Sequence, residues 1–199
     1  MAARGIRSAG IVFVGLALAL TGCGGSDSGA SAEQTAADEE QVRAVLQEKG
    51  DAFTAWDTDR VAELTCAKYR EDSRSLDELV PPMDMFPADE SAALGPQGLA
   101  DLLAEQFTGA TPESLLAVST AVVDQNEPAY HDAMLDVVKQ IYSLKLDKID
   151  NIEVDGDTAT ADTTLTQTMG AQPPQTQTTK VTLVREDGEW KDCTPPATA

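Results

Sequence analysis

The sequence predicts an α+β domain in which a helical N-terminal part packs on a C-terminal antiparallel four-stranded meander. Up to about residue 142, apolar residues recur every three or four positions, which is typical of amphipathic helices. From Leu144 onward the period falls to two, and Asp155-Gly156 and Asp187-Gly188 supply hairpin signals. A sheet with one apolar face needs a cover, so we expect the helices to supply it. Residues 41–196 are long enough to form one such domain.

The first two helices are predicted within residues 41–72. One runs from Gln41 to about Trp56, with its apolar residues on one face. Asp57-Thr58-Asp59 offers an N-cap for the second. Because Cys66 belongs to the apolar set of this second helix, we expect it to lie on a helix beside apolar neighbours.

Residues 73–95 are predicted to be mainly a loop. Pro81-Pro82 ends any short helix over residues 75–80, because proline lacks the backbone donor and disfavours helix in the preceding residue. Met83, Met85 and Phe86 then form an apolar cluster inside the loop. Such a cluster covers one edge of a core or, alternatively, lines the mouth of a ligand pocket.

Three helices with clear start signals follow. Pro96 stands at the first position of one that ends at Gly109. Thr111-Pro112-Glu113 opens the next, and Asn126 caps the third. The apolar stripe of this third helix consists of Tyr130, Met134, Val137, Val138 and Ile141.

The strands after residue 144 alternate between apolar and polar residues. The strand predicted over Thr158–Thr168 has its apolar residues on one face and threonines on the other. A third strand covers about Thr176–Arg185, and a fourth holds Trp190 and Cys193. The meander should therefore have one face for a core and one threonine-rich face for water.

The N-terminus has the order of a secretory signal. Arg4 and Arg7 precede an apolar run from Ile11 to Leu20, and small residues follow. Ten apolar residues are too few to span about 30 Å of hydrocarbon, which takes roughly 20. An ordinary cleaved signal peptide is one interpretation of this stretch.

A more specific interpretation rests on the segment Leu20-Thr21-Gly22-Cys23, which resembles the lipobox of bacterial lipoproteins. The resemblance implies cleavage before Cys23, a diacylglycerol on its thiol and an acylated amino group. Residues 1–22 would then be a lipoprotein signal peptide. Residues 23–40, rich in Gly, Ser and Ala, would be a lipidated flexible tether. The domain would be anchored at the extracytoplasmic face of the bacterial cell membrane.

The charge of the chain excludes one class of partner. The net charge is −20, and removing residues 1–22 takes away Arg4 and Arg7 but no acid, which makes it −22. Such a surface repels nucleic acid, so we expect no nucleic-acid partner. An acidic surface also keeps an exported protein soluble, which is the simpler explanation of the charge.

Three cysteines are present, and lipidation of Cys23 leaves Cys66 and Cys193. An exported domain lies in an oxidising compartment, so these two thiols most simply form one disulfide. A catalytic or metal-binding role is the alternative. The two cysteines lack CxxC spacing, however, and His131 is the single histidine, too few to complete a zinc set. We therefore expect no metal site and no cofactor.

Two segments near the C-terminus resemble a known pattern: Val154-Asp155-Gly156-Asp157-Thr158-Ala159-Thr160-Ala161 and Val184-Arg185-Glu186-Asp187-Gly188-Glu189-Trp190-Lys191. They are similar to the end of exported domains in the nuclear transport factor 2-like superfamily, which includes ketosteroid isomerases and polyketide cyclases, and most similar to lipoproteins of actinobacterial envelopes. The resemblance covers about residues 38–72 and 144–194. It implies a disulfide between the helix cysteine and the one after the last Trp. Residues 81–142 add more helix than such a domain normally has, and no catalytic residue of the superfamily can be carried over.

Two functions follow as hypotheses. One is a non-catalytic envelope lipoprotein whose domain binds a small apolar ligand or a protein partner. The other is an enzyme with isomerase- or cyclase-like chemistry, which needs a buried carboxyl with a raised pKa near a Tyr or His donor. Asp132 and Asp136, near Tyr130 and His131, are its candidates. Most other acids lie at caps and turns, which favours binding over catalysis.

The expected ligand cavity lies between the sheet and the helices, beside the loop at residues 83–86. We expect it to bind without turnover. Its predicted walls are Met83, Met85, Phe86, Tyr130 and Met134.

Overall fold

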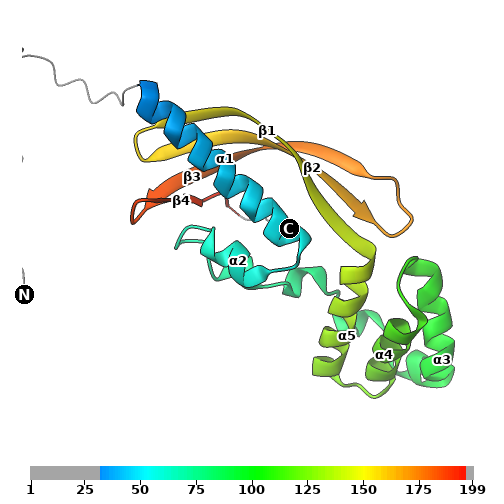
Figure 1. Ribbon diagram of the computed structural model, residues 1–199. Helices are drawn as coiled ribbons and strands as arrows, with labels where there is room; N and C mark the ends of the chain where they lie inside the picture. Colours follow the sequence, from blue (N-terminus) through cyan, green and yellow to red (C-terminus); the bar gives the residue numbers. More distant parts are fainter. Residues whose placement is uncertain (1–31, 196–199) are drawn as a thin grey trace, which may run out of the picture.

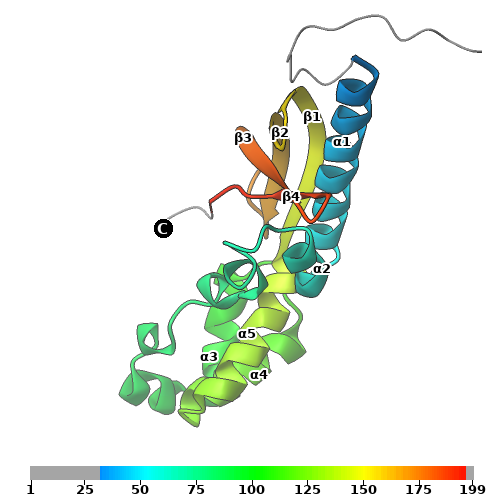
Figure 2. The ribbon, with the colours of Figure 1, turned by 90° about the vertical axis from the view of Figure 1, so that its left-hand side faces the viewer.

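The computed structural model describes residues 32–195, which form five α-helices and one four-stranded sheet (Figures 1 and 2). Three short 3₁₀ turns over residues 72–85 join the second helix to the third. The helices are α1 (Ala32–Thr54), α2 (Thr58–Glu63), α3 (Ala88–Gln106), α4 (Pro112–Val123) and α5 (Glu127–Ile141). The strands are β1 (Tyr142–Asp155), β2 (Thr158–Met169), β3 (Gln175–Glu186) and β4 (Glu189–Asp192).

The sheet is an antiparallel meander of order β1-β2-β3-β4, which confirms the predicted α+β class. Asp187 and Gly188 both have positive φ, 52° and 86°, as a type I′ turn requires. The first hairpin differs from the prediction. Asp155 pairs with Thr158, so the loop residues are Gly156 and Asp157, and of these only Gly156 has positive φ. This turn is therefore not type I′.

Helix α1 begins at Ala32 rather than at the predicted Gln41. Residues 32–40, assigned to a flexible tether, are thus helical. Ala and Glu have high helix propensity, and the buried Asp38 accepts a hydrogen bond from Arg185 Nη2 on β3. The Arg185 guanidinium in turn lies 4.5 Å from the Trp190 ring centroid. The predicted signal peptide, Cys23 and the first part of the tether lie outside the described residues.

Helices α4 and α5 start where the sequence predicts. The Thr111 side chain accepts from Ser114 N at 3.3 Å, and the Asn126 side chain accepts from Ala129 N at 3.2 Å. Helix α3 differs, because it contains residues 88–94, which were expected in a loop. It kinks at Gly95, whose φ of 68° suits glycine, directly before the predicted start at residue 96.

The helices differ in whether they cover the sheet or pack on one another. Helix α1 lies along one face of the sheet and supplies Val42 and Leu46 to its core (Figure 2). Helices α3 to α5 instead pack on one another beyond the end of the sheet (Figure 1). The reason is that α5 ends at Ile141 and continues directly into β1 at Tyr142, which places this bundle at the strand's start. The cover is therefore α1, and the bundle has its own core of Leu99, Ala100, Leu103, Leu115, Val118, Ala121, Val122, Tyr130, Met134, Val137 and Val138.

Candidate functional site

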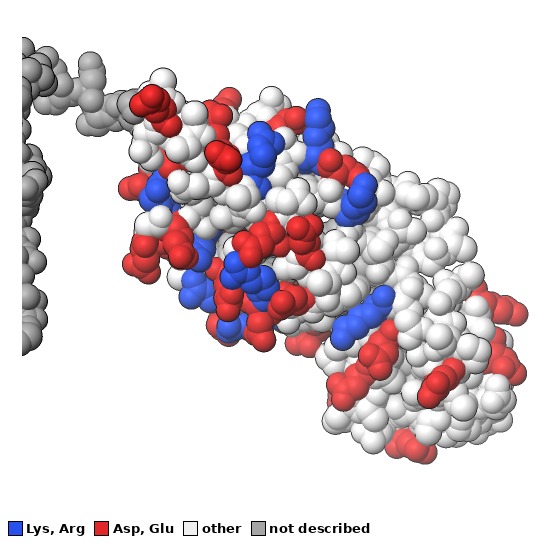
Figure 3. All heavy atoms as spheres, viewed as in Figure 1, with Lys and Arg blue, Asp and Glu red and all other residues white. Residues whose placement is uncertain are grey.

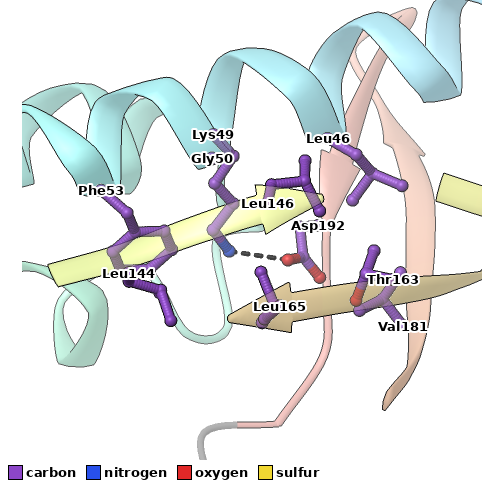
Figure 4. A pocket seen from close by; sticks show the side chains of 10 residues that line it. All are labelled: Leu46, Lys49, Gly50, Phe53, Leu144, Leu146, Thr163, Leu165, Val181 and Asp192. Carbon is purple, nitrogen blue, oxygen red and sulfur yellow. Dashed lines mark hydrogen bonds and ion pairs between the residues drawn. The ribbon is translucent and has the colours of Figure 1, made fainter. Parts of the chain in front are cut away.

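An apolar groove of about 90 Å³ lies between the C-terminal half of α1 and the sheet (Figure 4). Its walls come from α1 and from all four strands, so residues far apart in the chain build it together. The side chains that line it are mostly aliphatic, and one acid and one base are the charged members. The lining residues are Leu46, Lys49, Gly50, Phe53, Leu144, Leu146, Thr163, Leu165, Val181 and Asp192.

The spacing of residues on α1 builds one wall. Leu46, Lys49 and Phe53 recur every three or four residues and therefore share a helix face. Gly50 lets the helix approach β1, since a Cβ at this position would lie 2.9 Å from Leu146 Cβ. Phe53 is 43% exposed, which marks the open side of the groove.

The polar part of the groove is an ion pair between Lys49 and Asp192. Lys49 Nζ donates to Asp192 Oδ2 at 2.7 Å, and the two side chains are only 13% and 8% exposed (Figure 4). Asp192 Oδ1 also accepts from Thr194 N at 2.8 Å and from Thr194 Oγ1 at 2.6 Å. The Lys49 ammonium lies 5.8 Å from the Phe53 ring centroid. An ammonium has three donors, so one bond to Asp192 leaves Lys49 with donor capacity inside an apolar groove.

Asp192 is held in place by the chain segment that follows α2. Asp192 N donates to Leu64 O and Cys66 N donates to Asp192 O, both at 2.9 Å. Cys66 and Cys193 are joined by a disulfide with a Cα–Cα distance of 5.1 Å. Cys66 is buried but lies just after α2, not on a helix as expected, because Leu64 is already the C-cap. The crosslink thus fixes the position of one polar group of the groove.

Tyr130 and Met134, predicted to line a cavity, instead fill the core of the bundle. They are 1% and 0% exposed. Tyr130 Oη donates to Pro81 O at 2.7 Å, and burial raises the pKa of Tyr130 to about 12. Tight packing leaves these two side chains no open space of their own to line.

The apolar cluster at residues 83–86 also lies away from the groove. Phe86 packs edge-on against Tyr130, with ring centroids 6.0 Å apart. Met83 packs partly buried against the bundle core, whereas Met85 is 66% exposed. The predicted pocket location is therefore corrected: this cluster covers an edge of the bundle core, and the groove lies between α1 and the sheet.

The acid–base candidates do not form a buried site. The Asp132 side chain is 89% exposed, and Asp136 is exposed as well. His131 Nε2 lies 3.0 Å from Asp77 Oδ1 on the surface. The hydrogen bond from Arg185 holds the pKa of the buried Asp38 below its ordinary value, which is opposite to what a general acid needs.

Sequence reasoning missed Lys49 and Asp192, although a signal for each was present. Lys49 interrupts the apolar stripe of α1 between Leu46 and Phe53. Asp192 stands two residues after the buried Trp190 and so faces the same side of its strand. A charge at an inward-facing position is costly unless paired, so each predicts a buried partner of opposite sign.

A second, wider hollow of about 450 Å³ lies over α4 and the start of α5. Leu116, Ala117, Ala121 and Ala129 contribute its apolar part. None of the described residues that line it has a buried charged side chain, which makes it less suited to orient a ligand.

Two kinds of feature are absent from residues 32–195. Within this range no group of three or more His, Cys, Asp or Glu side chains is placed to hold a metal ion. None of the helices in the same range combines the length and apolar character needed to cross a membrane.

Comparisons with known proteins assign no family. Neither a protein-family model nor a curated protein sequence matches the chain. Among solved structures, a SEC-C motif-containing protein from Rhodopseudomonas palustris matches with TM-score 0.40 and 12% identity, over 81% of each chain. A protein from Mycobacterium tuberculosis, described as of unknown function, matches with TM-score 0.38 and 11% identity, over 81% of this chain and 70% of the other. Likenesses at this level carry no argument about family or function.

Proposed function

We propose that this protein is an exported, membrane-anchored lipoprotein and that its folded domain is a non-catalytic binding module of the cell envelope. The lipobox-like segment ending at Cys23 supports the anchor. The groove between α1 and the sheet supports the binding role. A small molecule with a slender apolar tail is its proposed ligand.

The size of the groove limits what enters it. The groove has a volume of about 90 Å³. Ligand pockets that enclose a whole drug-sized molecule are larger, about 300–1,000 Å³. The groove therefore suits the end of a slender chain, with the rest of the molecule lying over its open side at Phe53.

The observation that carries the proposal is the spare donor capacity of Lys49 among aliphatic walls. A ligand oxygen placed beside Lys49 Nζ gains a charge-assisted hydrogen bond in a site that little water reaches. Apolar groups of the same ligand lie against Leu146 and Leu165. A carboxylate with an alkyl tail, as in a fatty acid, meets both conditions when it shares the Lys49 ammonium with Asp192.

The test compares two probes with the same tail, octanoate and octyltrimethylammonium, on the full chain in lipid nanodiscs. Net charge alone favours the cation on this acidic protein, whereas only the carboxylate can accept a hydrogen bond from Lys49. We expect octanoate to stabilise the domain, by about 2.7 kcal/mol at 100 times its dissociation constant. It should also slow hydrogen exchange over residues 46–53.

A matched pair of variants locates the binding. Leu165→Trp fills the groove and should weaken octanoate binding at least tenfold. Leu102→Trp places the same ring at a 47% exposed position on α3 and should leave binding unchanged. Equal binding by both variants, or equal binding of the two probes, contradicts the proposal.

A further inference from the structure

Among residues 32–195, strand β3 has a free edge, because β4 is much shorter than β3. Residues Leu183–Glu186 pair with β4, and within this described range the preceding part of β3 pairs only with β2. At Thr182 the chain after β4 still closes the edge: Thr182 N donates to Thr194 Oγ1 at 3.0 Å, and Cys193 N donates to Thr182 O at 2.7 Å. Before Thr182, residues 175–180 are exposed.

The backbone N–H and C=O of Thr182 point away from β2, and their direction shows which other residues of β3 point these groups to the same side. In an antiparallel ladder, successive residues point their N–H and C=O groups to opposite sides. Thr176, Thr178 and Lys180 therefore turn these groups outward, as Thr182 does. Together they offer three donors and three acceptors that take no part in the β2–β3 ladder.

In the part of the chain that the structure describes, this edge lacks the protection that edge strands normally have. The opposite edge of the sheet, β1, carries several charges and two register shifts, which prevent another strand from pairing. The pairing of β3 with β2 has no register shift, and Gln175–Thr179 carry no charge. A regular, uncharged edge is a template for another strand.

Charge decides which strand fits. Copies of a chain with net charge −20 repel each other, so they can approach only through a region without acids. Figure 3 shows such a region, where white side chains cover the β2–β3 hairpin while acids and bases gather elsewhere on this face. Lys180, the one charge on the edge segment, already binds Asp162 at 3.4 Å. The orange start of β3 also runs along the side of the hairpin away from the α3–α5 bundle (Figure 1).

We propose that two copies of this chain associate through antiparallel pairing of their β3 edges, centred on Thr178. In this register Thr178 faces Thr178 of the second copy, and Thr176 faces Lys180. Every outward N–H and C=O of these three residues then finds a partner, and no like charges oppose each other. The contact is two-fold symmetric and closes as a dimer.

Cysteine substitution in the full chain tests the register. Two Thr178→Cys residues would lie about 5.5 Å apart at Cα, within the range of a disulfide. Thr176→Cys is the matched control, since its two copies would be separated by about four residues, or roughly 13 Å. On non-reducing gels of membranes, we expect a covalent dimer for Thr178→Cys and little or none for Thr176→Cys or the parent chain.

Thr178→Pro tests the edge without a crosslink. It removes one outward N–H and leaves the β2–β3 ladder intact. Light scattering of the detergent-solubilised protein should give a dimer for the parent chain and a monomer for this variant. The proposal is overturned by a monomeric parent chain, by equal crosslinking at both cysteine positions, or by adducts of Thr178→Cys only with other proteins.

Discussion

Replacing Lys49 by Met tests whether the ion pair in the groove is a buried one. The substitution removes the ammonium and keeps most of the side-chain volume, so packing against α1 and the sheet changes little. Asp192 keeps its two bonds from Thr194 but loses its cation, with a side chain only 8% exposed. A buried charge without its partner is the main source of the expected cost.

The magnitude follows from the burial. Breaking a buried ion pair costs about 3–5 kcal/mol, and the remaining bonds to Asp192 place this pair at the lower end, about 3 kcal/mol. For a domain of this size that lowers Tm by about 6–12 °C. Lys145→Met is the matched control, because Lys145 bonds Asp147 at the same 2.7 Å but is 76% exposed. Its expected cost is under about 0.5 kcal/mol.

Urea unfolding followed by circular dichroism measures these differences. The double variant of Lys49→Met with Asp192→Asn should cost at least about 1 kcal/mol less than the sum of the single variants, since each single change leaves the other group unpaired. Equal costs for Lys49→Met and Lys145→Met would show that the pair is not buried in the way described. Additive single costs would show that the two groups do not interact.

Three further predictions concern the rest of the fold. The Arg185 bond lowers the pKa of Asp38, so the stability that this bond gives is complete above about pH 5 and is lost as pH falls through the lowered pKa. Asp38→Asn should flatten acid unfolding curves, and an unchanged curve would contradict this. In urea unfolding, the buried Met134 should lose about 2–5 kcal/mol of stability on substitution by Ala, and the exposed Met85 less than about 0.5 kcal/mol. Similar losses for the two variants would contradict the burial of Met134. Cys66→Ser removes the crosslink between residues 127 apart, and chain entropy predicts that the free energy of unfolding falls by about 4–5 kcal/mol. A fall of less than about 2 kcal/mol would mean that the bond constrains the unfolded chain little.

The parts of the fold that sequence predicts well are those with local chemistry. Thr111 and Asn126 mark the starts of two helices because their side chains cap nearby backbone donors. Asp187-Gly188 marks a hairpin because few other pairs take positive φ twice. In each case the cause and the structure lie within a few residues of each other.

The parts that sequence misses depend on distant contacts. Residues 32–40 contain no large apolar residue, yet they are helical, and Asp38 among them bonds Arg185 on β3. The groove needs Lys49 and Asp192 to meet across 143 residues, which no local pattern specifies. Met83 and Phe86 were apolar enough to suggest a pocket wall, but only the structure shows that both pack against the bundle core, Phe86 on the ring of Tyr130.

A crystal structure of the full chain with octanoate shows directly whether the groove between α1 and the sheet is a ligand site. We expect an alkyl chain against Leu146 and Leu165, with its carboxylate within hydrogen-bond distance of Lys49 Nζ. An empty groove at saturating octanoate, or octanoate bound only in the hollow over α4 at Leu116, would contradict it.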